Sequence, residues 1–575
     1  MKNLYKKSKM ALLVMVMLGA FSCKEQQEVE QNYTLFHGGT ILTVDEAFSE
    51  VEAMVIKDQK IVAVGSFENL NNEYGQSAKL IDLEGRTMLP GFIDAHSHAV
   101  SGALANNLMD YIGMSRFKTT EEVLEYLRQK VKETPEGDWI TGRNWDPAVQ
   151  DGPEELTTSI LDSISTQHPI FILNASGHLA YANSRAFEAS GIDSTVENPD
   201  GAEFVKDSQG NLNGVMKNML SFIQVMTANP KMQTYDPVPA LLELLDEWSA
   251  EGVTTSSEFA LGAATNSPAD LEIMLEAAKN EAFHVRLRAY PSYIINDQWN
   301  EIGLKNNTGN DLAKVVGFKL VADGSNQGFT GLQRETYCCS ASHMTSFGNE
   351  YTSVDDLYSY AKERTEQGFQ LAIHGNGDKA IDNILAVLQR LKDEGYEFEG
   401  LRPRIEHASI LHDDQIRKMK ELGVTPSFLI GHVYYWGTFM RDEVFGKEKV
   451  QLLDRCASVE KVNMPFSLHS DFMVTNTLPL EMIETAVTRR TWKEPDYQLA
   501  PQEAISVESA IKAVTAHAAW QLMSEDEIGS LEVGKYADMV ILEEDPRKVE
   551  PTNISEIKVL ETWFNGKKVY QLEEN

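Results

Sequence analysis

Short apolar runs alternate with longer stretches of helical periodicity through the middle of the chain. The runs lie at residues 88–95, 252–256, 285–290, 315–321, 369–373, 403–406, 424–428 and 465–468. Strands that alternate with helices are typical of a parallel sheet. The eight runs therefore predict an α/β protein whose central part, residues 89–519, is a (β/α)8 TIM barrel.

One further strand-like run, at residues 169–174, is left over by this count. It lies in a stretch of about 110–245 that is too long for a single barrel helix and is interrupted by Gly and Pro. We expect this stretch to be an insertion after the first barrel strand that forms a subdomain over the barrel mouth.

On both sides of this alternating region, the sequence consists of short β segments separated by turn residues. These segments lie at residues 33–36, 39–43, 53–56, 60–65 and 79–82, and again at 537–542, 557–560 and 562–570. Two β-rich ends that flank a long middle predict one small composite β-sandwich built from residues 33–88 and 520–575.

The first 22 residues resemble a secretory signal peptide, because four lysines precede the short apolar stretch 11–21. Ala20-Phe21-Ser22-Cys23 then resembles a loose lipobox, and the polar run 24–32 follows it. We expect export, lipidation at Cys23 and a tether over 23–32, which would anchor the protein to a bacterial membrane in the periplasm or at the cell surface. A plain signal peptide with an incidental cysteine is the alternative.

The net charge of −35 argues against nucleic acid and against anionic membrane surfaces as partners. We expect a small-molecule substrate and membrane contact only through the lipid anchor, and a homodimer stays open. Beyond Cys23 the chain has only Cys338, Cys339 and Cys456, so no disulfide framework is expected. Adjacent cysteines seldom bridge each other, since the geometry is strained.

Metal-binding residue types stand where the predicted strands end. His96 and His98 are two residues apart at the end of the first strand, so their side chains point the same way. Catalytic groups of such barrels lie at the carboxyl ends of the strands. The residues found at those ends are His96, His98, Lys319, His374, His407 and Asp471. Imidazole and carboxylate suit zinc and similar divalent ions, whereas any one of these histidines alone is more often structural.

Two stretches resemble the amidohydrolase superfamily: Leu89-Pro90-Gly91-Phe92-Ile93-Asp94-Ala95-His96-Ser97-His98, and Gly529 to Asp538 near the other end. Within it the chain resembles amidohydrolase family 3, the branch that holds N-substituted formamide deformylases. The Lys-x-x-x-Asp-Gly-Ser element at 319–325 and the insertion motif at 177–184 match that branch. The resemblance covers nearly the whole chain after the tether.

The resemblance implies one or two divalent metal ions, zinc foremost. Carried over by residue, His96, His98 and Asp471 hold one metal, and His374 and His407 hold a second. Lys319 bridges them as a carboxylated lysine, because a carbamate offers two oxygens and an ammonium offers no lone pair. The alternative is an ordinary charged Lys319 with a single metal.

The implied activity is hydrolysis of a carbon–nitrogen bond in an amide, N-acyl or formamide-type substrate, with Asp471 as the catalytic proton acceptor and donor. A deaminase or an ester or lactone hydrolase on the same fold is an enzyme alternative. The alternative that is not an enzyme is a cell-surface binding protein that keeps the fold without turnover. The chain departs from the family pattern at His469-Ser470-Asp471, where relatives commonly have Gly-Ser-Asp, and His469 is either an extra ligand or pocket group or a buried structural histidine.

Four further residues are candidates for substrate binding. They are His178 in the insertion, Arg143 and Trp145 in Gly142-Arg143-Asn144-Trp145-Asp146, and His432 after the seventh strand. A cation beside an aromatic ring suits a carboxylate or amide, but it is also a common surface stack.

Overall fold

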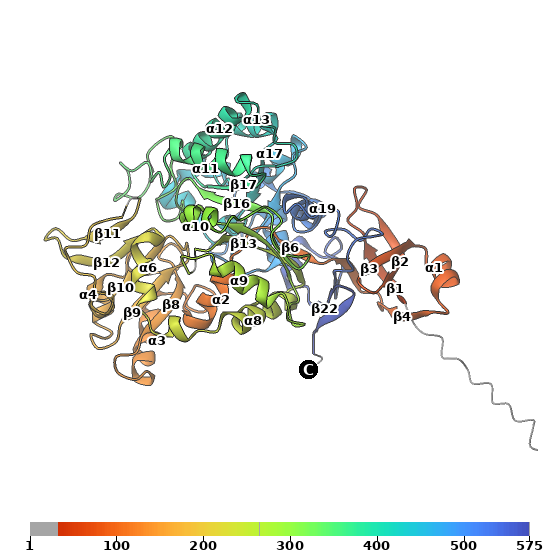
Figure 1. The fold of residues 1–575 in the computed structure, drawn as a ribbon, viewed down its shortest axis with the longest axis horizontal. Coiled ribbons are helices and arrows are strands. Elements are labelled where there is room, and N and C mark those ends of the chain that lie inside the picture. The colour runs from red at the N-terminus through yellow and green to blue at the C-terminus, as the bar shows by residue number, and fades with distance from the viewer. Residues whose placement is uncertain (1–32, 200, 264, 574–575) are drawn as a thin grey trace, which may run out of the picture.

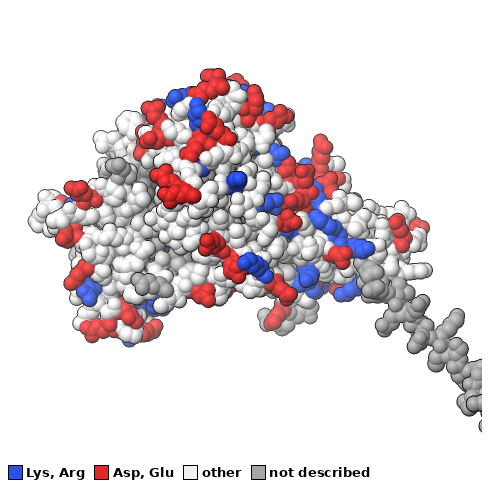
Figure 2. Space-filling view, viewed as in Figure 1, with Lys and Arg blue, Asp and Glu red and all other residues white. Residues whose placement is uncertain are grey.

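The computed structural model of the protein describes residues 33–199, 201–263 and 265–573. The predicted signal peptide, Cys23 and the tether lie outside these residues. Within the described part of the chain, no helix combines the length and apolar character needed to cross a bilayer. Asp and Glu side chains are spread over the face shown in Figure 2, in keeping with the negative net charge.

Strands from both ends of the chain form one sheet, which lies at one end of the molecule (Figure 1). Its strands are β1 (Tyr33–Leu42), β2 (Glu50–Lys57), β3 (Lys60–Gly65), β4 (Ala78–Asp82), β5 (Thr87–Pro90), β21 (Met539–Leu542), β22 (Val559–Phe564) and β23 (Lys567–Gln571). They pair in the order β23-β22-β21-β5-β1-β2-β3, with β4 beside β1. Phe36 of β1 meets Trp563 of β22 edge to face, with ring centres 5.1 Å apart. The strands that were expected to form a sandwich are thus joined by hydrogen bonds into a single sheet. Residues from its amino-terminal and carboxyl-terminal strands share one hydrophobic core.

Gly91 divides the apolar run 88–95 into two strands with different partners. Before it, β5 pairs with β1 and β21, and after it, β6 (Phe92–Asp94) pairs with β13. A Cβ atom on Gly91 would lie 2.1 Å from Oγ1 of Thr254, so only glycine allows the chain to pass here. The run is therefore not one barrel strand, as the sequence suggested, but the joint between the small sheet and the central strands.

The central strands form two parallel sheets. One has the order β15 (Ala313–Val315), β14 (Arg286–Pro291), β13 (Val253–Leu261) and β6, and the other has β16 (Gly317–Val321), β17 (Gln370–Gly375), β18 (Arg404–His407), β19 (Thr425–Phe428) and β20 (Ser467–Leu468). Each predicted run overlaps one of these strands, except the run 315–321, which overlaps both β15 and β16. The predicted mixed α/β class is confirmed. In the described residues, strand pairing does not run continuously around a closed barrel.

Helices cover the outside of these sheets (Figure 1). The principal ones are α8 (Pro237–Ala250), α9 (Ala269–Ala277), α11 (Val354–Glu366), α12 (Asp378–Asp393), α13 (Asp413–Leu422), α18 (Pro479–Thr488), α19 (Val507–Ala513) and α20 (Ala516–Gln521). In α12 the buried residues Ile381, Ile384, Leu388 and Leu391 recur at helical spacing, which gives the helix one apolar face toward the sheet. Helix α13 ends at Gly423, whose φ of +74° is the left-handed conformation that stops a helix.

The insertion is a separate six-stranded sheet on the other side of the molecule (Figure 1). Its strands pair in the order β11 (Glu203–Lys206), β12 (Leu212–Lys217), β10 (Leu179–Ala182), β9 (Ile170–Asn174), β8 (Ile140–Trp145) and β7 (Asp110–Tyr111). Along β9, Phe171 and Leu173 enter one core while Ile170 and Ile172 enter another, so alternate residues serve the two faces of the sheet. Helix α3 (Thr120–Glu133) covers one face and α6 (Met219–Thr227) the other.

Cys338 and Cys339 are joined by a disulfide, which corrects the expectation that adjacent cysteines stay unbridged. They lie in an irregular segment between β16 and α11, where neither helix nor sheet hydrogen bonding restricts the backbone. Cys456 is buried and free.

Candidate metal centre

The six residues predicted from the strand ends line one cavity. His96 and His98 follow β6, Lys319 lies in β16, His374 and His407 close β17 and β18, and Asp471 follows β20. The cavity holds about 1210 Å³ of empty space, its open mouth included. The structure therefore brings together side chains that are as much as 375 positions apart in the sequence, from His96 to Asp471.

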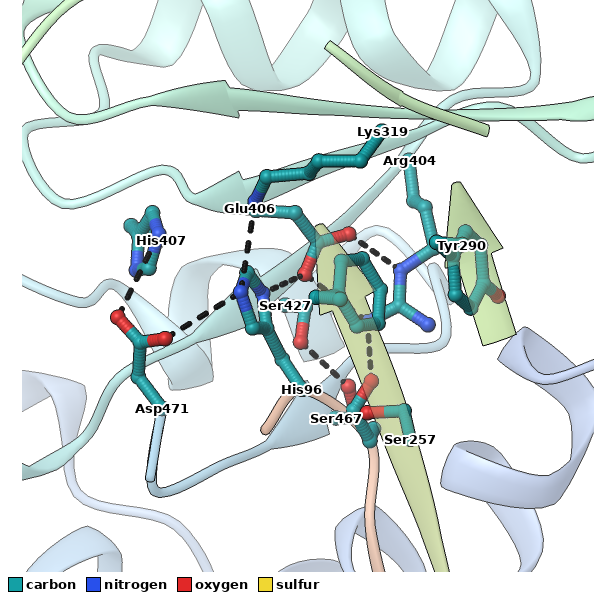
Figure 3. A network of polar contacts seen from close by, with 12 residues as sticks. His96, Ser257, Tyr290, Lys319, Arg404, Glu406, His407, Ser427, Ser467 and Asp471 are labelled. Carbon is teal, nitrogen blue, oxygen red and sulfur yellow. Dashed lines mark hydrogen bonds and ion pairs between the residues drawn. The ribbon is translucent and has the colours of Figure 1, made fainter. Parts of the chain in front are cut away.

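His96, His98 and Asp471 form the tightest donor group. Oδ1 of Asp471 lies 3.3 Å from Nε2 of His96 and 3.1 Å from Nε2 of His98. One donor atom from each residue lies within 4.8 Å of the others. His407 approaches the same carboxylate, with 3.9 Å between its Nε2 and Oδ2 of Asp471 (Figure 3). This spacing suits a single cation held among the three side chains.

Other protein groups hold the Nδ1 atoms of His96 and His98 by hydrogen bonds. Nδ1 of His96 donates to Oε2 of Glu406 over 2.6 Å, and Nδ1 of His98 donates to the carbonyl of Phe259. Glu406 is itself paired with Arg404, 2.5 Å from Nε to Oε1 (Figure 3). These contacts leave both Nε2 atoms facing Asp471, an arrangement typical of metal-binding histidines.

Glu406 was not among the predicted residues. It precedes His407 on β18 and is fully buried, which an isolated carboxylate almost never is. The signal that could have revealed it is the Arg404-x-Glu406 spacing, because alternate residues of a strand point the same way and these two form a pair.

His374, His407 and Lys319 form the second half of the site. The rings of His374 and His407 are 4.4 Å apart, and Nδ1 of His407 is buried without a hydrogen-bond partner. Nε2 of His374 lies 3.0 Å from the carbonyl of Gly324. Nζ of Lys319 lies 3.4 Å from Nε2 of His96, so the lysine reaches toward the first donor group (Figure 3).

The backbone is strained at two of the candidate ligands. His407 and Asp471 have φ values of 68° and 51°, in the left-handed region that residues other than glycine rarely adopt. Such conformations persist where the surrounding structure enforces them, and they are concentrated at functional sites.

Burial keeps three imidazoles of the site neutral. It lowers the pKa of His96, His374 and His407 well below that of an ordinary histidine. Burial also lowers the pKa of Lys319 to about 8. For Asp471 burial acts in the opposite direction, but the hydrogen bond from His98 and nearby positive charge outweigh it and hold the pKa below the usual range. Neutral imidazole and ionised carboxylate are the forms that bind metal.

His469 fills the space behind His96. The two rings stack with centres 4.7 Å apart, while Phe259 stacks on the other face of His96 at 4.0 Å. His469 is fully buried, and neither of its ring nitrogens has a hydrogen-bond partner among the described residues. It forms a second possible donor group with His96 and Glu406. Of the two interpretations left open by the sequence, a hydrogen-bonded structural histidine does not describe these contacts.

Of the four predicted substrate-binding residues, one lines the cavity and three do not. His178 lines the cavity, with its ring centre 5.3 Å from that of His374. His432 is buried behind His407, where its Nδ1 lies 3.2 Å from Oγ of Ser409, and it does not line the cavity. Arg143 is also outside the lining and is held by Asn144 and Asn106.

Trp145 lies in the core of the insertion, where the structure contradicts a substrate-binding role. It is fully buried, and its Nε1 donates to Oγ1 of Thr120 over 3.1 Å. The physical reason is a bulge in β8 between Arg143 and Trp145, which turns this indole into the apolar face of the sheet beside Tyr181.

Residues 79–570 match the family described as Amidohydrolase family. The chain belongs to the amidohydrolase family. The predicted membership of family 3 is confirmed by this match.

Two relatives of this amidohydrolase align with it over nearly their whole length. N-substituted formamide deformylase of Arthrobacter pascens is 26% identical over 537 residues, which cover 92% of this chain and 96% of the relative. Protein LONG AFTER FAR-RED 3 of Arabidopsis thaliana is 27% identical over 556 residues, 93% of this chain and 91% of the relative. Among solved structures, an uncharacterized metal-dependent hydrolase from Pyrococcus horikoshii superimposes with a TM-score of 0.71 at 24% identity, over 90% of this chain and 99% of that one.

Proposed function

We propose that this amidohydrolase is a metal-dependent hydrolase that cleaves a carbon–nitrogen bond of a small amide, N-acyl or formamide-type molecule. The observation that carries the proposal is the donor group of His96, His98 and Asp471, one atom from each within 4.8 Å, at the floor of a cavity. A relative covered over 96% of its length is an N-substituted formamide deformylase, which supports the choice of bond.

We propose that the central strands form one (β/α)8 barrel around this floor, with β15 and β16, which only Val316 separates, counted as one strand. Two hydrogen bonds at the sheet borders support it. The amide of Val316 donates to the carbonyl of Ala289 over 3.0 Å, between the two parallel sheets. The amide of Asp471 donates to the carbonyl of His96 over 2.9 Å, between the end of β20 and the end of β6. We also propose the domain limits expected from the sequence, with the barrel at 89–519 and the small β domain at 33–88 and 520–575.

The residues present fit a zinc site. Imidazole and carboxylate donors suit zinc, and the unpartnered nitrogens of His407 and His469 are buried polar atoms that a metal ion would satisfy. We assign one ion to His96, His98 and Asp471, and a second to His374 and His407. Lys319 would bridge them after carboxylation, because carbon dioxide adds only to the neutral amine, which a pKa of about 8 makes accessible.

Bound metal would supply Lewis acidity toward a substrate carbonyl and would acidify a water molecule. The chain's own residues supply the rest. Asp471 is ionised at neutral pH and faces the cavity, so its carboxylate accepts the proton of the attacking water and returns it to the leaving nitrogen. His178 faces the same space, and burial lowers its pKa to about 4, so it remains neutral and offers one N–H to the substrate oxygen.

Product analysis tests the bond type. Zinc-loaded protein is incubated with N-acyl and N-formyl amines in ¹⁸O-labelled water. Amide hydrolysis yields the amine together with a carboxylate that carries one new oxygen. Release of ammonia from the same preparation would identify a deaminase, and cleavage of esters or lactones but no amide would also contradict the proposal.

The role of His469 is tested by replacing it in two ways. His469→Phe preserves the stacking on His96 but removes both nitrogens, whereas His469→Gly restores the residue common in relatives and leaves a hole. If His469 donates to the metal, both variants lose metal affinity, by about 10- to 100-fold, in competition with a chelator. Tight binding by the Phe variant with weak binding by the Gly variant would show that His469 only supports the ring of His96.

We also propose that residues 1–22 direct export and that Cys23 is lipidated. Mass spectrometry of the mature amino terminus tests this directly. A mature chain that begins at a lipid-modified Cys23 is expected, and a chain that retains residues 1–22 would contradict it.

A further inference from the structure

The wall of the cavity opposite the strand ends is apolar and comes largely from the insertion. Leu173 lies at the end of β9, and Met219, Phe222 and Met226 lie one turn apart along α6. Met109 follows α2 (Ala99–Leu108), and Met473 comes from the segment after Asp471.

This wall is the inner surface of a packed core. Met109, Leu173 and Phe222 belong to one buried hydrophobic cluster of the insertion, and Met219, Met226 and Met473 pack against it. The wall is therefore held in place by the fold of the insertion. A preformed apolar surface of this kind favours ligands that bring an apolar group to it.

Charge is confined to the floor. Among the described residues that line the cavity, Lys319 and Asp471 are the only lysine, arginine, aspartate or glutamate, and both belong to the proposed metal site. The nearby guanidinium of Arg143 does not line the cavity and donates to Asn144 over 2.7 Å. The six apolar side chains of the wall cannot pair with a carboxylate or an ammonium group of a substrate, and burying such a group unpaired is costly.

We propose that the substrate is an amide whose substituent beyond the scissile bond is uncharged and apolar, and that the insertion wall binds this substituent. This inference rests on the proposed function for the identity of the bond that is cleaved. Methionine is unbranched and flexible, so a wall that includes Met219, Met226 and Met473 adapts to substituents of different shape. Substrates with a free carboxylate at this position are excluded.

Binding is tested without hydrolysis. The probes are methyl ketones of the form CH3–CO–CH2–R, in which a methylene replaces the amide nitrogen so that there is no bond to hydrolyse. Calorimetric titration of the zinc-loaded full chain should show affinity that rises about fourfold for each methylene added to an unbranched alkyl R, until the wall is covered. A ketone of the same length that ends in a carboxylate should bind more weakly than its alkyl counterpart.

A pair of neighbouring residues on α6 supplies the matched control. Met219→Gln places a polar amide of similar length on the wall and should reduce the gain per methylene, whereas Leu220→Gln alters a side chain that is 41% exposed and outside the lining. Affinity that does not rise with chain length, or a carboxylate ketone that binds more tightly, would overturn the proposal. So would equal effects of the two variants. Rising ketone affinity in a protein that hydrolyses no amide would leave this inference standing and reject the proposed function alone.

Discussion

Replacing Asp471 with Asn should reduce kcat by about 10³-fold or more while the protein retains at least one metal ion. The amide has nearly the same size and still offers an oxygen to a cation, but it cannot accept a proton. The carboxylate lies within 3.3 Å of Nε2 of both His96 and His98, so no other acid among the described cavity residues can take its place.

Single-turnover kinetics and elemental analysis of the same preparation measure both parts of this expectation. Asp146→Asn is the matched control, because Asp146 is also buried but accepts from Nε1 of Trp436 and does not line the main cavity. Its turnover should stay near that of the unaltered protein. Full activity of Asp471→Asn would reject the role of Asp471 as the proton acceptor, and complete loss of metal would show that it acts chiefly as a ligand.

Replacing Lys319 with Ala should lower metal content from about two ions per chain to about one. Turnover should fall by more than about 100-fold, because loss of a group that only orients a ligand already costs up to about that much and Lys319 would itself be a ligand. Nζ of Lys319 reaches within 3.4 Å of Nε2 of His96, and the alanine leaves this space empty. A small carboxylate could enter it and provide the two oxygens of the missing carbamate. Acetate or propionate should therefore restore part of both the metal content and the activity.

Lys314→Ala is the control for this experiment. Lys314 is paired with Glu527 in an ion pair of 3.2 Å away from the cavity, and its loss should change neither metal content nor turnover. Unchanged metal content in Lys319→Ala would favour the alternative of an ordinary charged lysine. Loss of the second metal without any rescue by carboxylates would argue against a carbamate bridge.

The donor residues could be predicted because they combine two regularities. Strands in a parallel arrangement present their carboxyl ends on one side, and His96-x-His98 shows the same-face spacing of a strand. The apolar runs located each central strand, so residues such as His374 and Asp471 could be placed at strand ends before any contact was known. The structure brings all six into one cavity.

Other features depend on contacts that no local pattern records. The division of the run 88–95 at Gly91 follows from the closeness of Thr254, which is more than 160 positions away. Glu406 looks like any carboxylate in the sequence, and only the approach of His96 and Arg404 shows why it is buried. Trp145 was expected beside Arg143 because residues two apart on a strand share a face, but the strand bulges at Asn144, whose φ is 68°, and the two side chains part. The apolar wall joins one face of α6, with Met219 and Met226, to residues of other segments, and no local pattern shows that these segments meet.

Metal content per chain tests the central claim most directly. Protein purified after growth with added zinc is assayed by elemental analysis, before and after chelation and reconstitution. About two zinc ions per chain are expected, with turnover that disappears on chelation and returns with zinc. A protein that binds no metal even after reconstitution would contradict a metal-dependent hydrolase and would favour a binding protein that keeps the fold without the chemistry.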